Sequence, residues 1–296
     1  MTTPVRPILT FTGNLLAERT LEFDAWSPGR TQRARAASFQ VGGKGINVAR
    51  MLTRLGVPNT ALCFAGGSTG AECEAWLNAR GHRHHVFRTT APTRSGTVVR
   101  TAAGSVEPRP ETTFLGPDVP PDDAAVKACA DFLDSQPAGG VLAVCGSVPG
   151  WADASFSPLR AALSSWTRRG ILAVDTYGPA LADLVALGPD LVKINAQELA
   201  GLPESLRPGR APAATRWIVT DGPGAVRVRD AGGERVFQPP RVTEVSPTGS
   251  GDVLLACVLA ALHARGAGLD EAVAFALPYA AANAAHPGVA EFPDPA

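Results

Sequence analysis

Short apolar runs alternate with amphipathic stretches along most of the chain. Runs rich in Val, Leu, Ile and Ala, bounded by Gly, Pro, Asp or Asn, predict buried strands at 61–66, 140–146, 171–176, 190–195 and 216–222. Apolar residues at helical spacing predict helices at 47–56, 71–81, 122–135, 157–170, 252–266 and 269–286. This alternation predicts an α/β fold in which helices cover both faces of a parallel sheet.

Two stretches, 19–41 and 84–109, do not fit the alternation. They read as short strands separated by polar turns. We therefore expect one domain over residues 1–296 with a small antiparallel sheet inserted into its α/β body. Such a sheet would form a lid over a site at the carboxyl ends of the parallel strands, where α/β proteins bind ligands.

Charge and hydropathy exclude several classes of protein. The 296 residues carry 27 basic and 27 acidic side chains, which removes the broad basic surface of a nucleic-acid-binding protein. No apolar run approaches the ~20 residues that span a bilayer, and the first residues lack the apolar core of a signal peptide. We expect a cytoplasmic protein with neither nucleic-acid nor membrane partners. The five cysteines form no C-x-x-C pair, which predicts buried free thiols.

The segment 247–252, Pro-Thr-Gly-Ser-Gly-Asp, directly precedes an apolar helix. A glycine-rich turn at a helix start presents unpaired backbone N–H groups, with the positive end of the helix dipole behind them. This arrangement suits an anion or a developing phosphoryl charge. Asp252 lies at the cap or in the first turn, and the alternative reading makes it an ordinary N-cap residue.

The segment 41–50, Val-Gly-Gly-Lys-Gly-Ile-Asn-Val-Ala-Arg, is a second candidate. It is not a Walker A loop, because Gly45 stands where Ser or Thr is required. Consecutive glycines let the backbone approach a ligand closely, and Lys44 and Asn47 would point toward it. The alternative is a tight turn with a solvated lysine. Only three lysines occur in the chain, Lys44, Lys127 and Lys193, so a lysine kept here is a weak further signal.

At 190–198 a predicted strand ends in polar residues, and Asn195 and Glu198 share one face at i, i+3. An amide and a carboxylate at this spacing can hold the water shell of Mg²⁺. The alternative is a helix capping box. Further polar pieces follow other strands at 146–147, 175–178 and 220–224. The histidines at 82, 84 and 85 lack partner ligands for a metal and read as a polar strand of the lid.

Taken together in order, the segments GGKGINVAR, GSVP, DTYGPAL, DLVKINAQEL, TDGPGAV and TGSGD resemble the ribokinase-like PfkB family of carbohydrate kinases. The flanks of GGKGINVAR are most similar to the branch of 1-phosphofructokinase and tagatose-6-phosphate kinase. The resemblance implies a ribokinase-like three-layer α/β/α sandwich with a mainly parallel sheet and a small β-sheet lid. It also implies an ATP-dependent kinase that uses Mg²⁺ and acts on a phosphorylated ketohexose, and a homodimer contact through the lid.

The resemblance also implies roles for individual residues. Asp252 corresponds to the family's catalytic base, and its anion hole corresponds to Gly249, Ser250 and Gly251. The residues that correspond to the family's sugar-phosphate site are Glu18, Gly43, Lys44, Asn47, Arg94 and Ser147. The residues that correspond to its site for the nucleotide phosphates and Mg²⁺ are Lys193, Asn195 and Glu198, of which the last two would hold the metal through water. The residues that correspond to the rest of its nucleotide site are Thr220, Gly222 and Thr248.

Glu18 departs from the family, where an Asp that binds the sugar is usual, so the preferred sugar is left open. Two rival functions also stay open: a kinase of an unphosphorylated sugar or nucleoside, and a non-catalytic protein that binds sugar phosphates. Arg94, Lys44 and Ser147 favour a phosphorylated substrate, because a dianion requires such positive charge. Asp252 and the intact glycine turn favour catalysis over mere binding.

Overall fold

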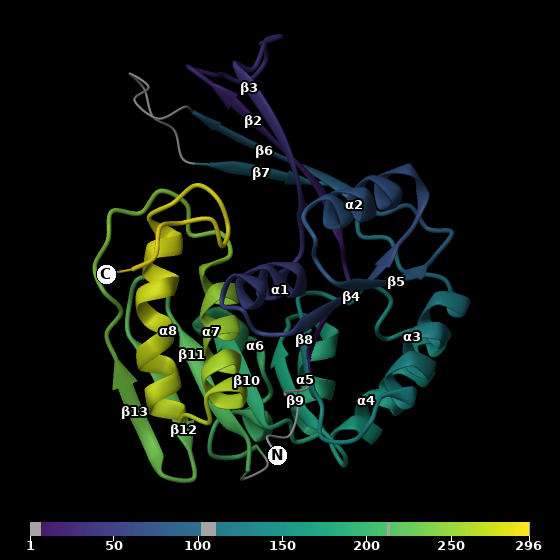
Figure 1. The fold of residues 1–296 in the computed structure, drawn as a ribbon, viewed down its shortest axis with the longest axis vertical. Coiled ribbons are helices and arrows are strands. Elements are labelled where there is room, and N and C mark those ends of the chain that lie inside the picture. The colour runs from purple at the N-terminus through teal and green to yellow at the C-terminus, as the bar shows by residue number, and fades with distance from the viewer. Residues whose placement is uncertain (1–6, 102–110, 212–213, 296) are drawn as a thin grey trace.

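The computed structural model describes residues 7–101, 111–211 and 214–295 (Figure 1). Its large sheet has the strand order β13-β12-β11-β10-β9-β8-β1-β4-β5. Neighbours from β11 to β5 pair in parallel, and β12 and β13 extend the sheet as an antiparallel hairpin. The strands are β1 (Ile8–Thr12), β4 (Asn59–Ala65), β5 (His84–Arg88), β8 (Val141–Cys145), β9 (Ile171–Asp175), β10 (Leu191–Asn195), β11 (Arg216–Thr220), β12 (Val226–Asp230) and β13 (Gly233–Phe237).

Helices cover both faces of this sheet (Figure 1), so the predicted α/β/α layering is confirmed. One face packs against α3 (Asp123–Ser135), α4 (Ser157–Trp166) and α5 (Pro179–Ala186). The other packs against α1 (Lys44–Arg54), α7 (Ser250–Ala264) and α8 (Leu269–Ala284). The remaining helices are α2 (Gly67–Ala79), the short α6 (Ala196–Gly201), and the single 3-10 turns Ala154–Phe156 and Glu204–Leu206.

The central strands β1 and β8 carry no charged side chain, since neither face meets water. Every residue of β1 and of β8 is buried, and alternate side chains enter the two helix-covered cores. The strand at 8–12 and the hairpin of β12 and β13 are absent from the sequence-based prediction. The hairpin escapes a search for apolar runs because charged, half-exposed side chains alternate with buried valines in β12.

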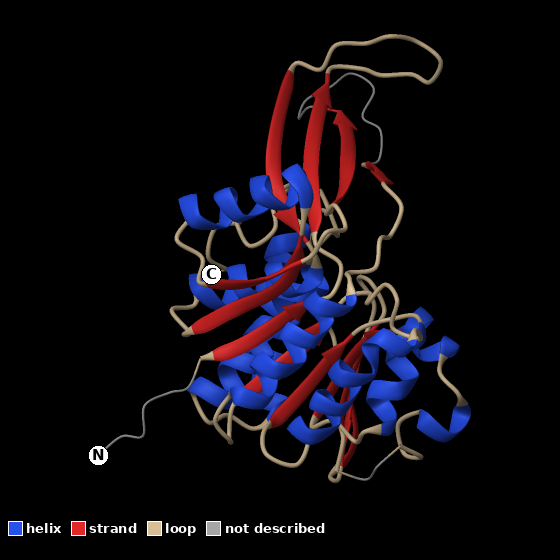
Figure 2. Ribbon diagram, turned by 90° about the vertical axis from the view of Figure 1, so that its right-hand side faces the viewer, coloured by secondary structure: helices blue, strands red, loops and turns tan. Residues whose placement is uncertain are grey.

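The lid is a second sheet of four strands, ordered β3-β2-β6-β7, which stands out from one end of the α/β body (Figure 2). Its strands are β2 (Leu16–Phe23), β3 (Ala36–Gly42), β6 (Arg94–Thr101) and β7 (Thr112–Leu115). The prediction of a purely antiparallel lid is wrong, because its two central strands, β2 and β6, pair in parallel. The chain enters both strands from the α/β body, so they run outward together.

The predicted lid stretch 84–109 also begins too early. Residues 84–88 form β5, which pairs in parallel with β4 at the edge of the large sheet. Phe87 supplies the physical reason, because it is 2% exposed within the core beneath α3. His84 and His85 therefore belong to this edge strand rather than to the lid, and the His85 ring stacks on Phe132 of α3. Residues 102–110 of the predicted stretch lie outside the described residues.

The structure also shows the state of the cysteines and the apolar character of the helices. All five cysteines are buried free thiols, as predicted. Across the described residues, no helix combines the length and apolar character needed to cross a bilayer.

The first turn of α1 lies directly on β1, and Gly45 permits this close approach. A Cβ atom at Gly45 would lie 2.8 Å from the backbone oxygen of Phe11 and closer still to the Thr12 hydroxyl. Backbone atoms cannot move aside as a flexible side chain would. The glycine therefore sets the distance between α1 and the sheet beneath it.

We expect Gly45→Ala to lower the free energy of unfolding by about 1–3 kcal/mol, the usual cost of overpacking a tight contact. Gly201→Ala is the matched control, because Gly201 ends α6 and a Cβ there would meet nothing within 4 Å. Its unfolding free energy should change by less than about 0.5 kcal/mol, as at open surface positions. Urea titration followed by circular dichroism measures both, and equal effects would contradict the contact.

Candidate active site

A cavity of about 810 Å³ opens at the carboxyl ends of the parallel strands, beneath the lid. Residues of the lid strands line its upper part, among them Glu18, Gln40 and Arg94. The strand ends and the start of α7 line the rest. This is the position at which open α/β sheets bind ligands, and the volume suits two small molecules side by side.

The glycine turn 247–251 forms one wall of the cavity and leads into α7. Gly249 is the N-cap with a φ of 77°, and a Cβ there would lie 2.6 Å from the Val289 side chain. The first intrahelical bond runs from the Val253 N–H to the Gly249 carbonyl. Of the predicted anion hole of Gly249, Ser250 and Gly251, the Ser250 N–H already donates to the Pro247 carbonyl at 3.2 Å. The N–H groups of Gly251 and Asp252 precede the first intrahelical bond, as the first donors of a helix do, and so remain for an anion.

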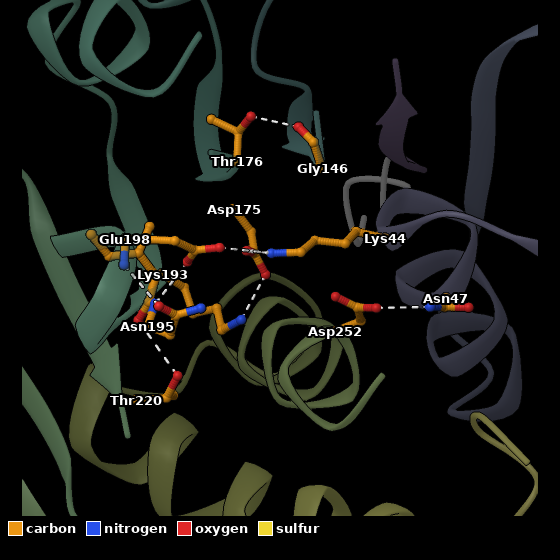
Figure 3. A network of polar contacts seen from close by, with 11 residues as sticks. Lys44, Asn47, Gly146, Asp175, Thr176, Lys193, Asn195, Glu198, Thr220 and Asp252 are labelled. Atoms are coloured by element: carbon orange, nitrogen blue, oxygen red, sulfur yellow. Dashed lines mark hydrogen bonds and ion pairs between the residues drawn. The ribbon is translucent and has the colours of Figure 1, made fainter. Parts of the chain in front are cut away.

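Asp252 is not a cap residue, so the alternative reading of this position is wrong. It lies in the first turn of α7, its side chain makes no cap hydrogen bond, and its Oδ2 accepts a hydrogen bond from Asn47 Nδ2 at 2.8 Å (Figure 3). Burial and the nearby Asp175 raise the pKa of Asp252 to about 6, against the lowering effect of Lys44, Lys193 and Asn47. A carboxylate with this pKa is a competent general base near neutral pH.

Two lysines converge on the buried carboxylate of Asp175 (Figure 3). Lys44 Nζ lies 2.9 Å from Oδ1, and Lys193 Nζ lies 2.8 Å from Oδ2. The alternative reading of Lys44 as a solvated lysine is therefore wrong. Burial opposes both charges, yet the net effect raises the pKa of Lys44 and lowers that of Asp175. Lys44 and Asp175 are thus both charged at neutral pH.

Asp175 was not assigned a role by sequence analysis. The available signal was its position, since it is the charged residue that ends the apolar run Ile171–Asp175. Three strand ends meet there: β9 carries Asp175, β10 carries Lys193, and Gly146 after β8 lies beside the Lys44 side chain. Only the parallel pairing of β8, β9 and β10 brings these positions together.

Asn195 and Glu198 form the capping box that the sequence left as an alternative. Glu198 N–H donates to Asn195 Oδ1, and Asn195 N–H donates to Glu198 Oε2, both at 2.8 Å. The other carboxylate oxygen, Glu198 Oε1, lies 3.4 Å from Lys44 Nζ. Within the described residues, no three His, Cys, Asp or Glu side chains gather to hold a metal. The oxygen atoms of Asn195 and Glu198 are of the kind that Mg²⁺ prefers, and a metal held through its water shell at these residues stays a prediction.

Arg94 and Ser147 also line the cavity, and they contact two residues that sequence analysis did not select. Asn14 Nδ2 donates to Ser147 Oγ at 2.9 Å and to Asp118 Oδ1 at 2.8 Å. Arg94 also donates to Asp118 Oδ1 at 2.8 Å. Lys44 was predicted to bind the sugar phosphate together with Arg94 and Ser147. In the structure its side chain contacts Asp175 and Glu198 instead.

Glu18 lines the cavity from β2 and is 8% exposed. Its Oε1 accepts a hydrogen bond from the side-chain amide of Gln40 on β3. Burial is the main reason why the pKa of Glu18 lies above its usual value, and Glu111 adds to it. Gln40 was not selected from the sequence, because a lone glutamine in a strand carries no pattern.

The predicted nucleotide-side residues Thr220, Gly222 and Thr248 line the cavity as well. Apolar side chains from the loop before β12, from β12 itself and from α8 also line the cavity, together with the charged Arg241 and Glu244. The apolar residues include Pro223, Val226, Leu277, Ala280 and Ala281. Gly43, which caps α1 with a φ of 124°, lies on the floor nearer the lid. The structure thus places every predicted site residue except Glu198 in the wall of one cavity, and Glu198 directly behind Lys44.

A family profile described as pfkB family carbohydrate kinase matches residues 13–296. The chain belongs to the PfkB family. It is similar to a 1-phosphofructokinase of Rhodobacter capsulatus, with 31% identity over 283 residues that cover 89% of this chain and 85% of the relative. It is 30% identical over 258 residues to the ATP-dependent 6-phosphofructokinase isozyme 2 of Escherichia coli strain K12, covering 82% and 81%.

Among solved structures, the phosphofructokinase-2 from Escherichia coli in complex with fructose-6-phosphate aligns with a TM-score of 0.80. The identity is 25%, and 93% of each chain is covered. PfkB membership and this alignment confirm the ribokinase-like fold and the enzyme class that the sequence predicted, a carbohydrate kinase. The sequence-based assignment of individual site residues stays a prediction.

We expect Lys193→Met to raise the pKa of Asp252 above about 6, because the ammonium group of Lys193 stabilises the ionised carboxylate. Carboxyl carbon NMR of the free protein measures this titration, with Asp252→Asn to assign the signal. Lys127→Met is the matched control, since Lys127 is exposed on α3 and pairs with Asp131. An Asp252 titration that stays in place in Lys193→Met would contradict the electrostatics described above.

Proposed function

We propose that the protein transfers the γ-phosphoryl group of ATP to a hydroxyl of a phosphorylated ketohexose. The observation that carries this proposal is the place of Asp252 between the free N–H groups of α7 and the two lysines on Asp175. A base, an anion hole and fixed positive charge thus meet at one point of the cavity. Phosphoryl transfer depends on this combination of positioning and electrostatic stabilisation.

In the proposed reaction, Asp252 accepts the proton of the sugar hydroxyl as its oxygen attacks the γ-phosphorus. The bond from phosphorus to the bridging oxygen of ADP breaks, and the oxygen of ADP takes up the electron pair. The N–H groups of Gly251 and Asp252 and the ammonium groups of Lys44 and Lys193 stabilise the charge on the transferred group. Mg²⁺ would supply charge neutralisation for the phosphates of ATP, and Asn195 and Glu198, whose Oε1 also lies 3.4 Å from Lys44 Nζ, would hold the ion through its water shell.

The assignment of a phosphorylated sugar rests on Arg94, Ser147 and Asn14, which line the cavity. Kinship with phosphofructokinases supports it. One observation favours an unphosphorylated substrate: Asp118 already neutralises Arg94 at 2.8 Å. Asp118 engages only the Nη1 donor of Arg94, and the buried Nε–H has no partner among the described residues. A phosphate that binds there would be repelled by the neighbouring carboxylate, whereas a neutral sugar would not.

The predicted homodimer through the lid remains part of the proposal. Phe114 and Leu115 on β7 are more than half exposed, although both are large and apolar. A second copy packed against the lid would cover them, which would lower the free energy of the exposed apolar surface. The predicted cytoplasmic location is likewise part of the proposal.

We expect Asp252→Asn to lower kcat by about 10²–10⁴, the usual contribution of a positioned general base. The KM for ATP should change little, because Asp252 accepts a proton rather than binding the nucleotide. In the unmodified enzyme the base must be ionised, so kcat should fall as the pH drops through about 6. Steady-state kinetics of both proteins across pH checks this, and undiminished turnover in Asp252→Asn would exclude the mechanism.

We expect Arg94→Ala to raise the KM for a phosphorylated ketohexose at least tenfold, or about 1.4 kcal/mol, within the range for hydrogen bonds to charged groups. Asp118→Asn should lower that KM, because it removes a negative charge beside Arg94 that would repel the phosphate of the substrate. Fructose 1-phosphate, fructose 6-phosphate and tagatose 6-phosphate serve as substrates, with their unphosphorylated sugars as comparison. If neither variant changes the KM of any phosphorylated sugar, the substrate is an unphosphorylated sugar or a nucleoside.

A further inference from the structure

Glu18 and Gln40 are direct partners across the antiparallel strands β2 and β3. Side chains at such paired positions project from the same face of a sheet, and both of these line the cavity. The next pair along, Arg19 and Phe39, projects from the opposite face. There the Arg19 guanidinium lies over the Phe39 ring at 5.1 Å and pairs with Glu72 at the surface.

The orientation of the Gln40 amide follows from the donor on its other side. Arg50 Nη1 lies 3.2 Å from Gln40 Oε1, and a guanidinium can only donate hydrogen bonds. The carbonyl oxygen of Gln40 therefore faces Arg50, and its NH₂ group faces Glu18. A reversed amide would place two donors against each other and an oxygen against a carboxylate. The hydrogen bond to Glu18 thus has a fixed direction.

Arg50 is itself held at a fixed position. Its side chain is 5% exposed, its Nη2 lies 2.8 Å from Glu291 Oε1, and its guanidinium lies 5.5 Å from the centre of the Trp76 ring. A hydrogen-bonded relay, Glu291–Arg50–Gln40–Glu18, therefore runs from the C-terminal segment to the cavity. A guanidinium with two engaged nitrogens has little freedom to rotate away from Gln40.

The far end of the relay adjoins the anion hole. The N–H of Ala290, next to Glu291, donates to Asn283 Oδ1 at 3.0 Å. Asn283 Nδ2 in turn donates to the Thr248 carbonyl at 2.9 Å, in the glycine turn that precedes α7. The C-terminal segment thus supports both Glu18, at the lid, and the turn that would receive the transferred phosphoryl group.

We propose that Gln40, held by Arg50, is a positioning residue that fixes the Glu18 carboxylate for the sugar and thereby contributes to the choice of sugar. Gln40 engages one carboxylate oxygen and so leaves Oε2 for a hydroxyl group of the substrate. Glu18 is longer than the Asp usual at this position and has one more rotatable bond, so it requires such a restraint. This inference rests on the proposed function, in which Glu18 binds the sugar.

Three groups affect the charge state of Glu18 besides its burial. Gln40 and the cation of Arg50 favour the ionised carboxylate, and the anion of Glu111, from the segment before β7, opposes it. Glu291 pairs with Arg50 at 2.8 Å and so helps to hold that cation in place. Removing the Gln40 hydrogen bond leaves burial and Glu111 opposed by Arg50 alone, so the pKa of Glu18 should rise.

The test is Gln40→Leu, which keeps the size of the side chain and removes both hydrogen bonds. We expect kcat/KM for the preferred ketohexose phosphate to fall about tenfold, the loss of one hydrogen bond to a charged group. The KM for ATP should stay within about twofold, because the nucleotide does not contact this pair. The acid limb of kcat/KM for the sugar should move to higher pH, while that of kcat, governed by Asp252, stays in place.

Three further variants separate the possible outcomes. Arg19→Ala is the matched control, which removes a contact between the same two strands from the opposite face and should leave every kinetic parameter unchanged. Glu291→Gln loosens the relay at its far end and should lower kcat/KM for the sugar in the same sense, but less. Glu18→Gln removes the titrating group, so adding Gln40→Leu to it should cause no further shift of the acid limb.

The outcomes distinguish this proposal from the one on which it rests. If Glu18→Gln leaves kcat/KM for every tested sugar unchanged, Glu18 does not bind the sugar, and the assignment of the substrate end is wrong. If Glu18→Gln lowers kcat/KM but Gln40→Leu behaves like Arg19→Ala, Gln40 has only a structural role, and the present proposal is overturned. A fall in kcat/KM for Gln40→Leu without a shift of the acid limb also overturns it.

Discussion

The carboxylate of Asp175, buried between the ammonium groups of Lys44 and Lys193, is the interaction on which the site depends. Three charges taken out of water are stable only when each has a partner at hydrogen-bond distance. Asp175 ends β9, Lys193 lies in β10 and Lys44 begins α1, so the triad joins the sheet to the helix above it. It also sets the local potential, since the pKa of Asp252 responds to all three charges.

The polar side chains of the lid also have hydrogen-bonding partners. Its cavity face carries Glu18 from β2, Gln40 from β3 and Arg94 from β6, and each is held by a neighbour of complementary hydrogen-bonding character. The parallel pairing of β2 and β6 sets Leu16 beside Arg94, directly above the strand ends. The lid therefore contributes side chains to the site as well as cover, and its register decides which side chains reach the cavity.

Membership of the PfkB family identifies the protein as a carbohydrate kinase and so relates the α/β body and the lid to one reaction. In the proposed mechanism, the body supplies a base, donors and positive charge at one point, and the lid supplies the residues that face the acceptor sugar. Asp118, paired with Arg94, carries a charge opposite to that expected beside a phosphate. We therefore expect the choice of sugar to depend on the balance between Arg94 and Asp118, and on the carboxylate of Glu18.

The sequence by itself determined the parallel α/β body, most of its helices, the glycine turn before Asp252 and the family. These follow from periodicity and from contiguous motifs, which act over a few residues. Only the tertiary structure decided the role of Asp175, the mixed lid, the place of residues 84–88 in the large sheet, and the relay from Glu291 to Glu18. Each of these joins residues distant along the chain: a lone Asp, Gln or Arg acquires meaning only when strand pairing and burial select its partner and remove the water that would otherwise compete.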